Sequence, residues 1–119
     1  MRKFILAVFL SMMPVAGFAD MAEIIDVKMT KVGMTWRMDA TIQHPDTGWE
    51  HFADGWEVLD ANGNRLGYRE LMHPHVDEQP FTRSLSNLVF PDGTREVIVR
   101  AHCSVDGWSD KVIRVSLQP

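Results

Sequence analysis

The residues of this chain that are best suited to bind a metal ion fall in three short segments. All five histidines and the only cysteine, Cys103, lie within residues 44–54, 73–80 and 102–110. Imidazole and thiolate groups are ligands for zinc and copper, whereas calcium prefers oxygen ligands. If the three segments meet in the fold, the sequence predicts one polar, histidine-rich pole that binds a transition metal or another polar ligand.

The closest pair of candidate ligands is His73 and His75, which are separated by a proline. Proline favours an extended backbone, on which residues two apart point to the same side. We therefore expect His73 and His75 to be the first metal ligands, with His51 and His44 as additions and Glu78 as a further possibility. In the alternative interpretation, His73 and His75 hydrogen-bond to backbone groups and stiffen a loop without binding metal.

Cys103 belongs to an alternating stretch in which it shares a face with Val97 and Val99. This pattern predicts a buried, unreactive thiol in the core. The adjacent His102 would point to the opposite face, so it is badly placed to act as a base for the thiol. A copper(I) site made by Met72, Cys103 and a histidine is an alternative, because soft ligands favour that ion.

The elements that must position these residues are β-strands. Apolar and polar residues alternate along most of the chain, and Ala61–Asn64 is typical of a tight hairpin turn. Seven strands are expected, at residues 25–30, 34–42, from Trp56 onward, and at 65–72, 81–89, 97–103 and 113–117.

This pattern predicts an all-β fold, a seven-stranded antiparallel β-sandwich. Trp36 and the stretch 95–107 resemble the fibronectin type III or immunoglobulin-like version of that fold. Connections between antiparallel strands alternate between the two ends of the sandwich. The second, fourth and sixth connections, which carry the histidines, are therefore expected at one end.

Residues 1–19 have the features of a cleaved export signal. Arg2 and Lys3 form a charged start, residues 4–13 an apolar run, and small residues precede a cut ahead of Asp20. The apolar run is too short to span a bilayer as a helix, and no cysteine follows the cut to carry a lipid anchor. We expect a periplasmic or secreted protein.

The mature chain, residues 20–119, has the length of a single domain. Without Arg2 and Lys3 it holds ten basic and sixteen acidic residues, a formal net charge of −6. This charge argues against nucleic acid or an anionic membrane as a partner. A single cysteine cannot form an internal disulfide, and we expect a monomer. No motif of hydrolases is present, so we do not expect an enzyme.

Four segments resemble a family of small, uncharacterised exported bacterial proteins: DTGW at residues 46–49, ADGW at 53–56, HPH at 73–75 and EQPFTRS at 78–84. The resemblance covers most of the mature chain. It implies a single sandwich domain that works outside the cytoplasm. It implies no established activity, cofactor or catalytic residue.

Two functions follow from the predicted pole. The first is a binding module for zinc or copper. The second is a protein interaction domain, in which Trp49, Trp108, Glu78 and Arg83 contact a partner. A buried arginine needs a partner of opposite charge, so we expect Arg83 to organise the loops by meeting a carboxylate such as Glu78 or Asp54.

Overall fold

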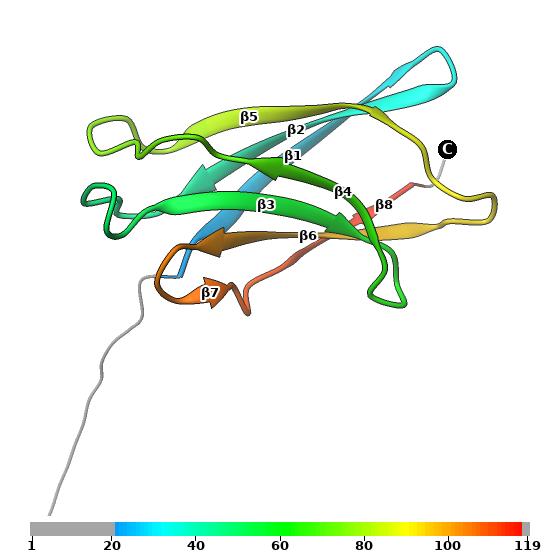
Figure 1. Cartoon of the computed structure of the whole chain (residues 1–119). Coiled ribbons are helices and arrows are strands. Elements are labelled where there is room, and N and C mark those ends of the chain that lie inside the picture. The colour runs from blue at the N-terminus through cyan, green and yellow to red at the C-terminus, as the bar shows by residue number, and fades with distance from the viewer. Residues whose placement is uncertain (1–20, 118–119) are drawn as a thin grey trace, which may run out of the picture.

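The computed structural model describes residues 21–117 and shows two antiparallel β-sheets packed face to face (Figure 1). The expected export signal, residues 1–19, lies outside the described part of the chain. Eight strands are present: β1 (Glu23–Val32), β2 (Thr35–Gln43), β3 (Ala53–Leu59), β4 (Arg65–Glu70), β5 (Phe81–Leu88), β6 (Glu96–Cys103), β7 (Gly107–Trp108) and β8 (Ile113–Ser116). Among the described residues, no helix has the length and apolar character needed to cross a bilayer.

The strand order confirms the predicted immunoglobulin-like sandwich. One sheet has the order β1-β2-β5, and the other has the order β4-β3-β6, with β7 and β8 both paired to β6. The strand count is eight rather than seven. The additional strand, β7, has two residues and is too short for any alternation to show in the sequence. It follows a turn at Gly107, whose φ of 81° lies in the left-handed region that glycine adopts at little cost.

Alternation produces the core, most clearly along β6, where every second side chain is buried. The central tryptophan of the core is Trp56 on β3, which is fully buried, whereas Trp36 on β2 is half-buried. The other buried apolar side chains come from both sheets and from the residues directly beside them: Ala22, Ile24, Met38, Ala40, Ile42, Ala53, Val58, Leu71, Phe81, Leu88, Val97, Val99, Ala101 and Cys103. Packing between the two sheets therefore supplies the stability that no disulfide provides.

Two expectations for the first two strands are wrong: that Ile25 shares the apolar face of Val27 and Met29, and that Met34 begins the second strand. The pairing of β1 with β2 shifts register between Ile24 and Asp26, so Ile24 faces the core and Ile25 is exposed. A bulge of this kind changes which residues face inward, and the sequence alternation alone does not reveal it. Met34 was expected to begin the second strand, but it lies in the preceding turn and is 93% exposed.

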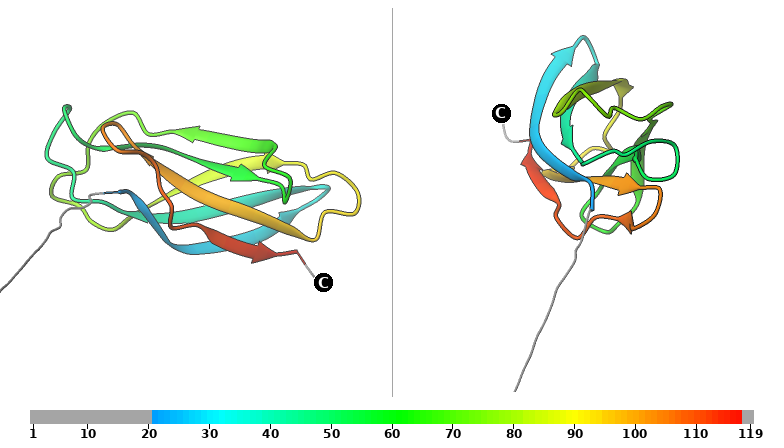
Figure 2. Two further views of the ribbon diagram at one scale, coloured as in Figure 1. Left: turned by 90° about the horizontal axis from the view of Figure 1, so that it is seen from below. Right: turned by 90° about the vertical axis from the view of Figure 1, so that its left-hand side faces the viewer.

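The three histidine-bearing connections do lie at one end of the sandwich. The β2–β3, β4–β5 and β6–β7 connections come together at the left of Figure 2, left panel, and at the left of Figure 1. Hydrogen bonds join them: the His75 backbone N–H donates to Asp46, and the Ser104 backbone N–H donates to the Phe52 carbonyl. The expectation that three segments distant in sequence form one pole is confirmed.

Candidate metal centre

Two histidines and the cysteine form a compact cluster at this pole. One ligand atom from each of His44, His51 and Cys103 lies within 4.8 Å of the other two. His44 and Cys103 are buried and His51 is half-buried. In the described part of the chain, no other group of three or more histidine, cysteine, aspartate or glutamate residues is arranged in this way. The cluster supplies two nitrogen donors and one sulfur donor, which could hold a metal ion.

Asp46 fixes the orientation of His44. Its Oδ1 lies 2.5 Å from Nδ1 of His44 and accepts the Ala53 backbone N–H at 3.0 Å, while Oδ2 accepts the His75 N–H at 2.7 Å. Because the Asp46 carboxylate only accepts hydrogen bonds, Nδ1 of His44 must carry the proton in their contact. Nε2 then keeps a free lone pair, and it is buried without a hydrogen-bond partner among the described residues. A carboxylate behind the distal nitrogen is a common support for a metal-binding histidine.

The short loop between His44 and β3 turns His51 back toward His44. Backbone hydrogen bonds link the Thr47 N–H to the His51 carbonyl and the His51 N–H to the Gly48 carbonyl. Gly48 has a φ of 149°, which a residue with a side chain rarely adopts. The imidazole rings of His44 and His51 consequently meet edge to face, with 4.9 Å between their centroids. Nε2 of His51 is also buried without a hydrogen-bond partner in the described structure.

The thiol of Cys103 lies at the end of β6, where the following turn surrounds it with donors. The backbone N–H groups of Val105 and Asp106 point at Sγ from 3.4 and 3.5 Å. Burial raises the pKa of the Cys103 thiol, although these two N–H groups oppose the rise. The thiol therefore carries its proton at neutral pH until a cation replaces it, and the N–H groups would stabilise the resulting thiolate.

The structure does not bring His73 and His75 into the cluster. His73 is exposed, and its Nδ1 lies 3.1 Å from the Pro74 carbonyl oxygen. His75 is buried and stacks on Phe81 with 3.9 Å between ring centroids. Burial is the main cause that lowers the pKa of His75, so its ring is neutral at neutral pH. Its Nε2 accepts a hydrogen bond from Arg83 at 2.8 Å, so Nδ1 holds the proton.

The expectation that Arg83 meets a carboxylate is wrong. Its guanidinium donates to His75 and to the Thr82 carbonyl, because the β4–β5 connection folds the His75 ring over β5. Glu78 is exposed, and the carboxylate of Asp54 instead lies 2.5 Å from Nδ1 of His102.

The other expected contact residues divide between an exposed rim and a packed sheet face. Trp49 is 68% exposed and touches Phe52 edge to face. Trp108 is half-buried on the outer face of the second sheet, where the guanidinium groups of Arg100 and Arg65 lie 4.7 and 5.8 Å from its ring. Met72, which was expected as a ligand only in the alternative copper(I) site, is 69% exposed.

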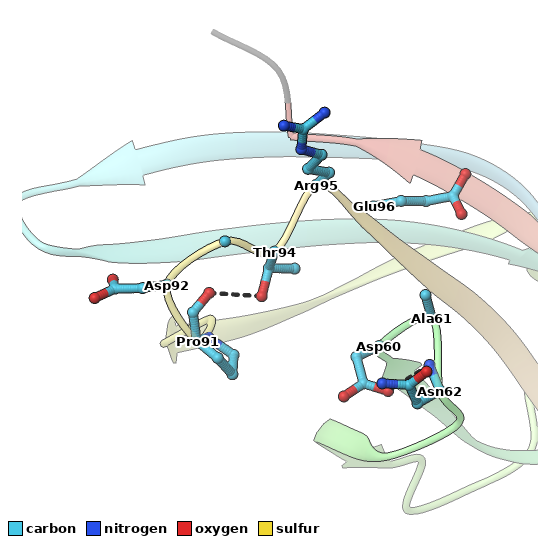
Figure 3. Close-up of a pocket in the computed structure, with 9 residues that line it drawn as sticks. Asp60, Ala61, Asn62, Pro91, Asp92, Thr94, Arg95 and Glu96 are labelled. Carbon is cyan, nitrogen blue, oxygen red and sulfur yellow. Dashed lines mark hydrogen bonds between the residues drawn. The ribbon is translucent and has the colours of Figure 1, made fainter.

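A cleft with a volume of about 500 Å³ lies at the opposite end of the molecule. The β3–β4 turn and the β5–β6 connection line it, and Figure 3 shows the side chains of Asp92, Arg95 and Glu96 pointing away from its centre. The carboxylate of Asp60 is already engaged by the Asn62 and Asn64 backbone N–H groups. This cleft therefore offers no set of converging ligands.

Comparison with known proteins supports the fold and one sequence relationship. The chain is 36% identical over 98 residues to a protein of Halomicrobium mukohataei described as a "Putative lipoprotein". The match covers 82% of this chain and 48% of the relative, so the chain spans about half the length of that relative. No protein-family model matches the chain.

Solved structures with the same fold are distant in sequence. A hypothetical protein of Pyrococcus horikoshii OT3 has a TM-score of 0.56 at 13% identity, covering 87% of this chain and 93% of its own. Superoxide reductase (1Fe-SOR) of Giardia intestinalis has a TM-score of 0.50 at 14% identity, and the match covers 80% of this chain and 99% of the reductase. A second superoxide reductase, in the oxidised state, has a TM-score of 0.52 at 14% identity, and the match covers 87% of this chain and 94% of that reductase. At this identity the likeness concerns the fold alone.

Proposed function

We propose that the protein is an exported module that binds one transition-metal ion, zinc or copper, through His44, His51 and Cys103. The observation that carries this proposal is the convergence of three ligand atoms within 4.8 Å, two of them buried imidazole nitrogens without partners. Buried polar atoms normally find a hydrogen bond. A cation that accepts both lone pairs removes the cost of leaving them unpaired.

Export is supported by the pattern of the first nineteen residues and by the description of the Halomicrobium relative. The surrounding residues support metal binding, because Asp46 orients His44 and two backbone N–H groups face the sulfur. Each of these is an outer contact that metal sites commonly use to tune their ligands. No acid, base or nucleophile beyond the cluster is required for this role.

The test is the metal content and the zinc and copper(I) affinities of the purified protein and four variants. We expect one ion per chain, with binding lost in His44→Ala, His51→Ala and Cys103→Ser. His73→Ala is the matched control, because His73 is an exposed histidine of the same pole that lies outside the cluster. If His73→Ala loses the ion while Cys103→Ser keeps it, the ligands are the pair expected from the sequence and the assignment made here is wrong.

A second function, docking of a protein partner, is favoured by the exposed apolar side chains of the same three loops. Trp49, Met72, Val76 and Val105 are each more than half exposed. Exposed apolar groups that gather at one end of a domain often mark an interaction site. This function predicts that Trp49→Ser abolishes binding to a defined partner while metal content stays at one ion per chain. Unchanged binding in Trp49→Ser together with Val105→Ser would contradict it.

A further inference from the structure

We propose that Asp106 is the fourth ligand of the ion and that the centre is built for a four-coordinate divalent cation, Zn²⁺ in preference to Cu⁺. This inference rests on the proposed metal-binding function and adds the coordination number and the identity of the ion. Asp106 lies in the turn between β6 and β7, three residues after Cys103. It lies beside the cluster of three and contacts two of its members.

Two distances from the Asp106 carboxylate match the ligand–ligand separations of a tetrahedral site. Oδ2 lies 3.6 Å from Sγ of Cys103 and 3.4 Å from Nε2 of His51. With a metal–sulfur distance of about 2.3 Å and metal–nitrogen and metal–oxygen distances of about 2.1 Å, tetrahedral angles place sulfur and oxygen about 3.6 Å apart and nitrogen and oxygen about 3.4 Å apart. Octahedral angles would bring the same pairs to about 3.1 and 3.0 Å.

The Cys103 thiol donates a hydrogen bond to Oδ2 of Asp106, which holds the carboxylate at the cluster and which a bound cation would replace. Although Oδ2 and Nε2 are 3.4 Å apart, Nε2 of His51 has no hydrogen-bond partner, so the carboxylate does not serve as its acceptor. An imidazole nitrogen and a carboxylate oxygen that face each other without a hydrogen bond can both bind the same cation. Completing the four ligands requires the carboxylate to approach His44, and the exposed position of Asp106 leaves room for that movement.

Charge balance favours a divalent ion. A thiolate and a carboxylate contribute two negative charges, which a divalent cation neutralises. Cu⁺ would leave one net negative charge at the site, next to the buried His44 and Cys103, where a neutral site is more favourable. Four protein ligands also leave no open position for a substrate, which is the arrangement of structural rather than catalytic zinc centres.

The test compares Asp106→Ala with Asp110→Ala, a nearby exposed carboxylate that serves as the control. Zn²⁺ affinity is measured by competition with a chelator, Cu⁺ affinity by competition with a copper(I) indicator, and geometry by the visible spectrum of the Co²⁺-loaded protein. In Asp106→Ala we expect Zn²⁺ affinity to fall on the order of 10- to 100-fold or more, since even outer contacts have effects of that size. The strong visible bands of four-coordinate Co²⁺ should weaken, and Cu⁺ affinity should stay the same or rise.

The outcomes separate this inference from the proposed function. If Asp106→Ala binds Zn²⁺ as tightly as the unmodified protein and its Co²⁺ spectrum is unchanged, Asp106 is not a ligand, while the three-residue site stands. If Asp110→Ala shows the same losses as Asp106→Ala, the effect is general electrostatics and the inference is overturned. If the unmodified protein binds no ion, the proposed function itself fails.

Discussion

Replacing Asp46 with alanine is the sharpest test of how the pole is built, because this one buried carboxylate holds three chain segments together. It accepts hydrogen bonds from the His44 ring and from the backbone N–H groups of Ala53 and His75. In Asp46→Ala all three donors stay buried without an acceptor. Each unsatisfied donor costs about 1–3 kcal/mol, so we expect a loss of about 4 kcal/mol after some entry of water.

The loss can be measured by urea unfolding followed by tryptophan fluorescence. With a slope of about 1–3 kcal/mol per molar urea, 4 kcal/mol lowers the midpoint by roughly 1.3–4 M. Because domains of this size have a free energy of unfolding of about 5–15 kcal/mol, Asp46→Ala would retain only part of its stability. The free energy of unfolding of Asp46→Asn should lie between those of the unmodified protein and Asp46→Ala. The amide keeps one acceptor oxygen but presents an NH₂ group to the remaining donors.

The matched control is Asp77→Ala, which removes an exposed carboxylate from the same pole. We expect its free energy of unfolding to change by no more than about 0.5 kcal/mol, as is usual for surface positions. A loss below about 1 kcal/mol in Asp46→Ala would show that solvent or neighbouring groups replace the carboxylate, and our account of the pole would be refuted.

Three further outcomes are expected. Zinc binding at neutral pH should release about one proton, because the metal displaces it from the protonated thiol of Cys103. Calorimetry in buffers of different ionisation enthalpy should detect the release, and zinc binding without it would contradict a protonated thiol. The hydrogen bond from Ser84 lowers the pKa of Asp39 below its usual 3.8. The ionised carboxylate therefore stabilises the fold fully above pH 3.8, and this stabilisation is lost as the pH falls through the lowered pKa. Ser84→Ala should move the pKa of Asp39 upward in an NMR titration and make the free energy of unfolding depend less on pH in the acid range. Gly67→Ala should destabilise the protein by about 1–3 kcal/mol in thermal unfolding, because the added Cβ would lie 2.6 Å from Cδ2 of the buried Leu88 and force it to shift.

The fold was predictable because alternation and turns are local properties of the sequence. Buried and exposed side chains alternate along β6 as its sequence predicts, and the parity of the connections places the histidine-bearing loops at one end. What local patterns could not show are the bulge in β1, which turns Ile24 rather than Ile25 inward, and the two-residue strand β7. Both depend on pairing between strands rather than on the composition of either strand.

The candidate site was predictable only in part. His44 and His51 were expected as ligands, but after His73 and His75, because spacing alone favours the two histidines that are closest in sequence. The structure pairs histidines seven residues apart, since the turn at Gly48 reverses the chain between them. The alternation correctly placed Cys103 among buried residues.

The supporting carboxylates were missed. Asp46 lies two residues after His44 and Asp106 three residues after Cys103, which in retrospect is the available signal. A carboxylate close in sequence to a candidate ligand is common in exposed loops, so the sequence alone could not distinguish these two from the other acidic residues. The burial of Asp46 and the contacts of both carboxylates depend on how three distant segments fold over one another.

The position of the cluster has a mechanical consequence. His44 directly follows β2 in one sheet, and Cys103 ends β6 in the other. In antibody domains the corresponding pair of strands carries the inter-sheet disulfide. An ion bound by His44 and Cys103 would be a reversible cross-link between the two sheets. It would close a chain loop of roughly sixty residues and so restrict the unfolded state as a covalent cross-link does. Such a domain can be locked or loosened by the supply of metal around it, without any oxidation of its single thiol.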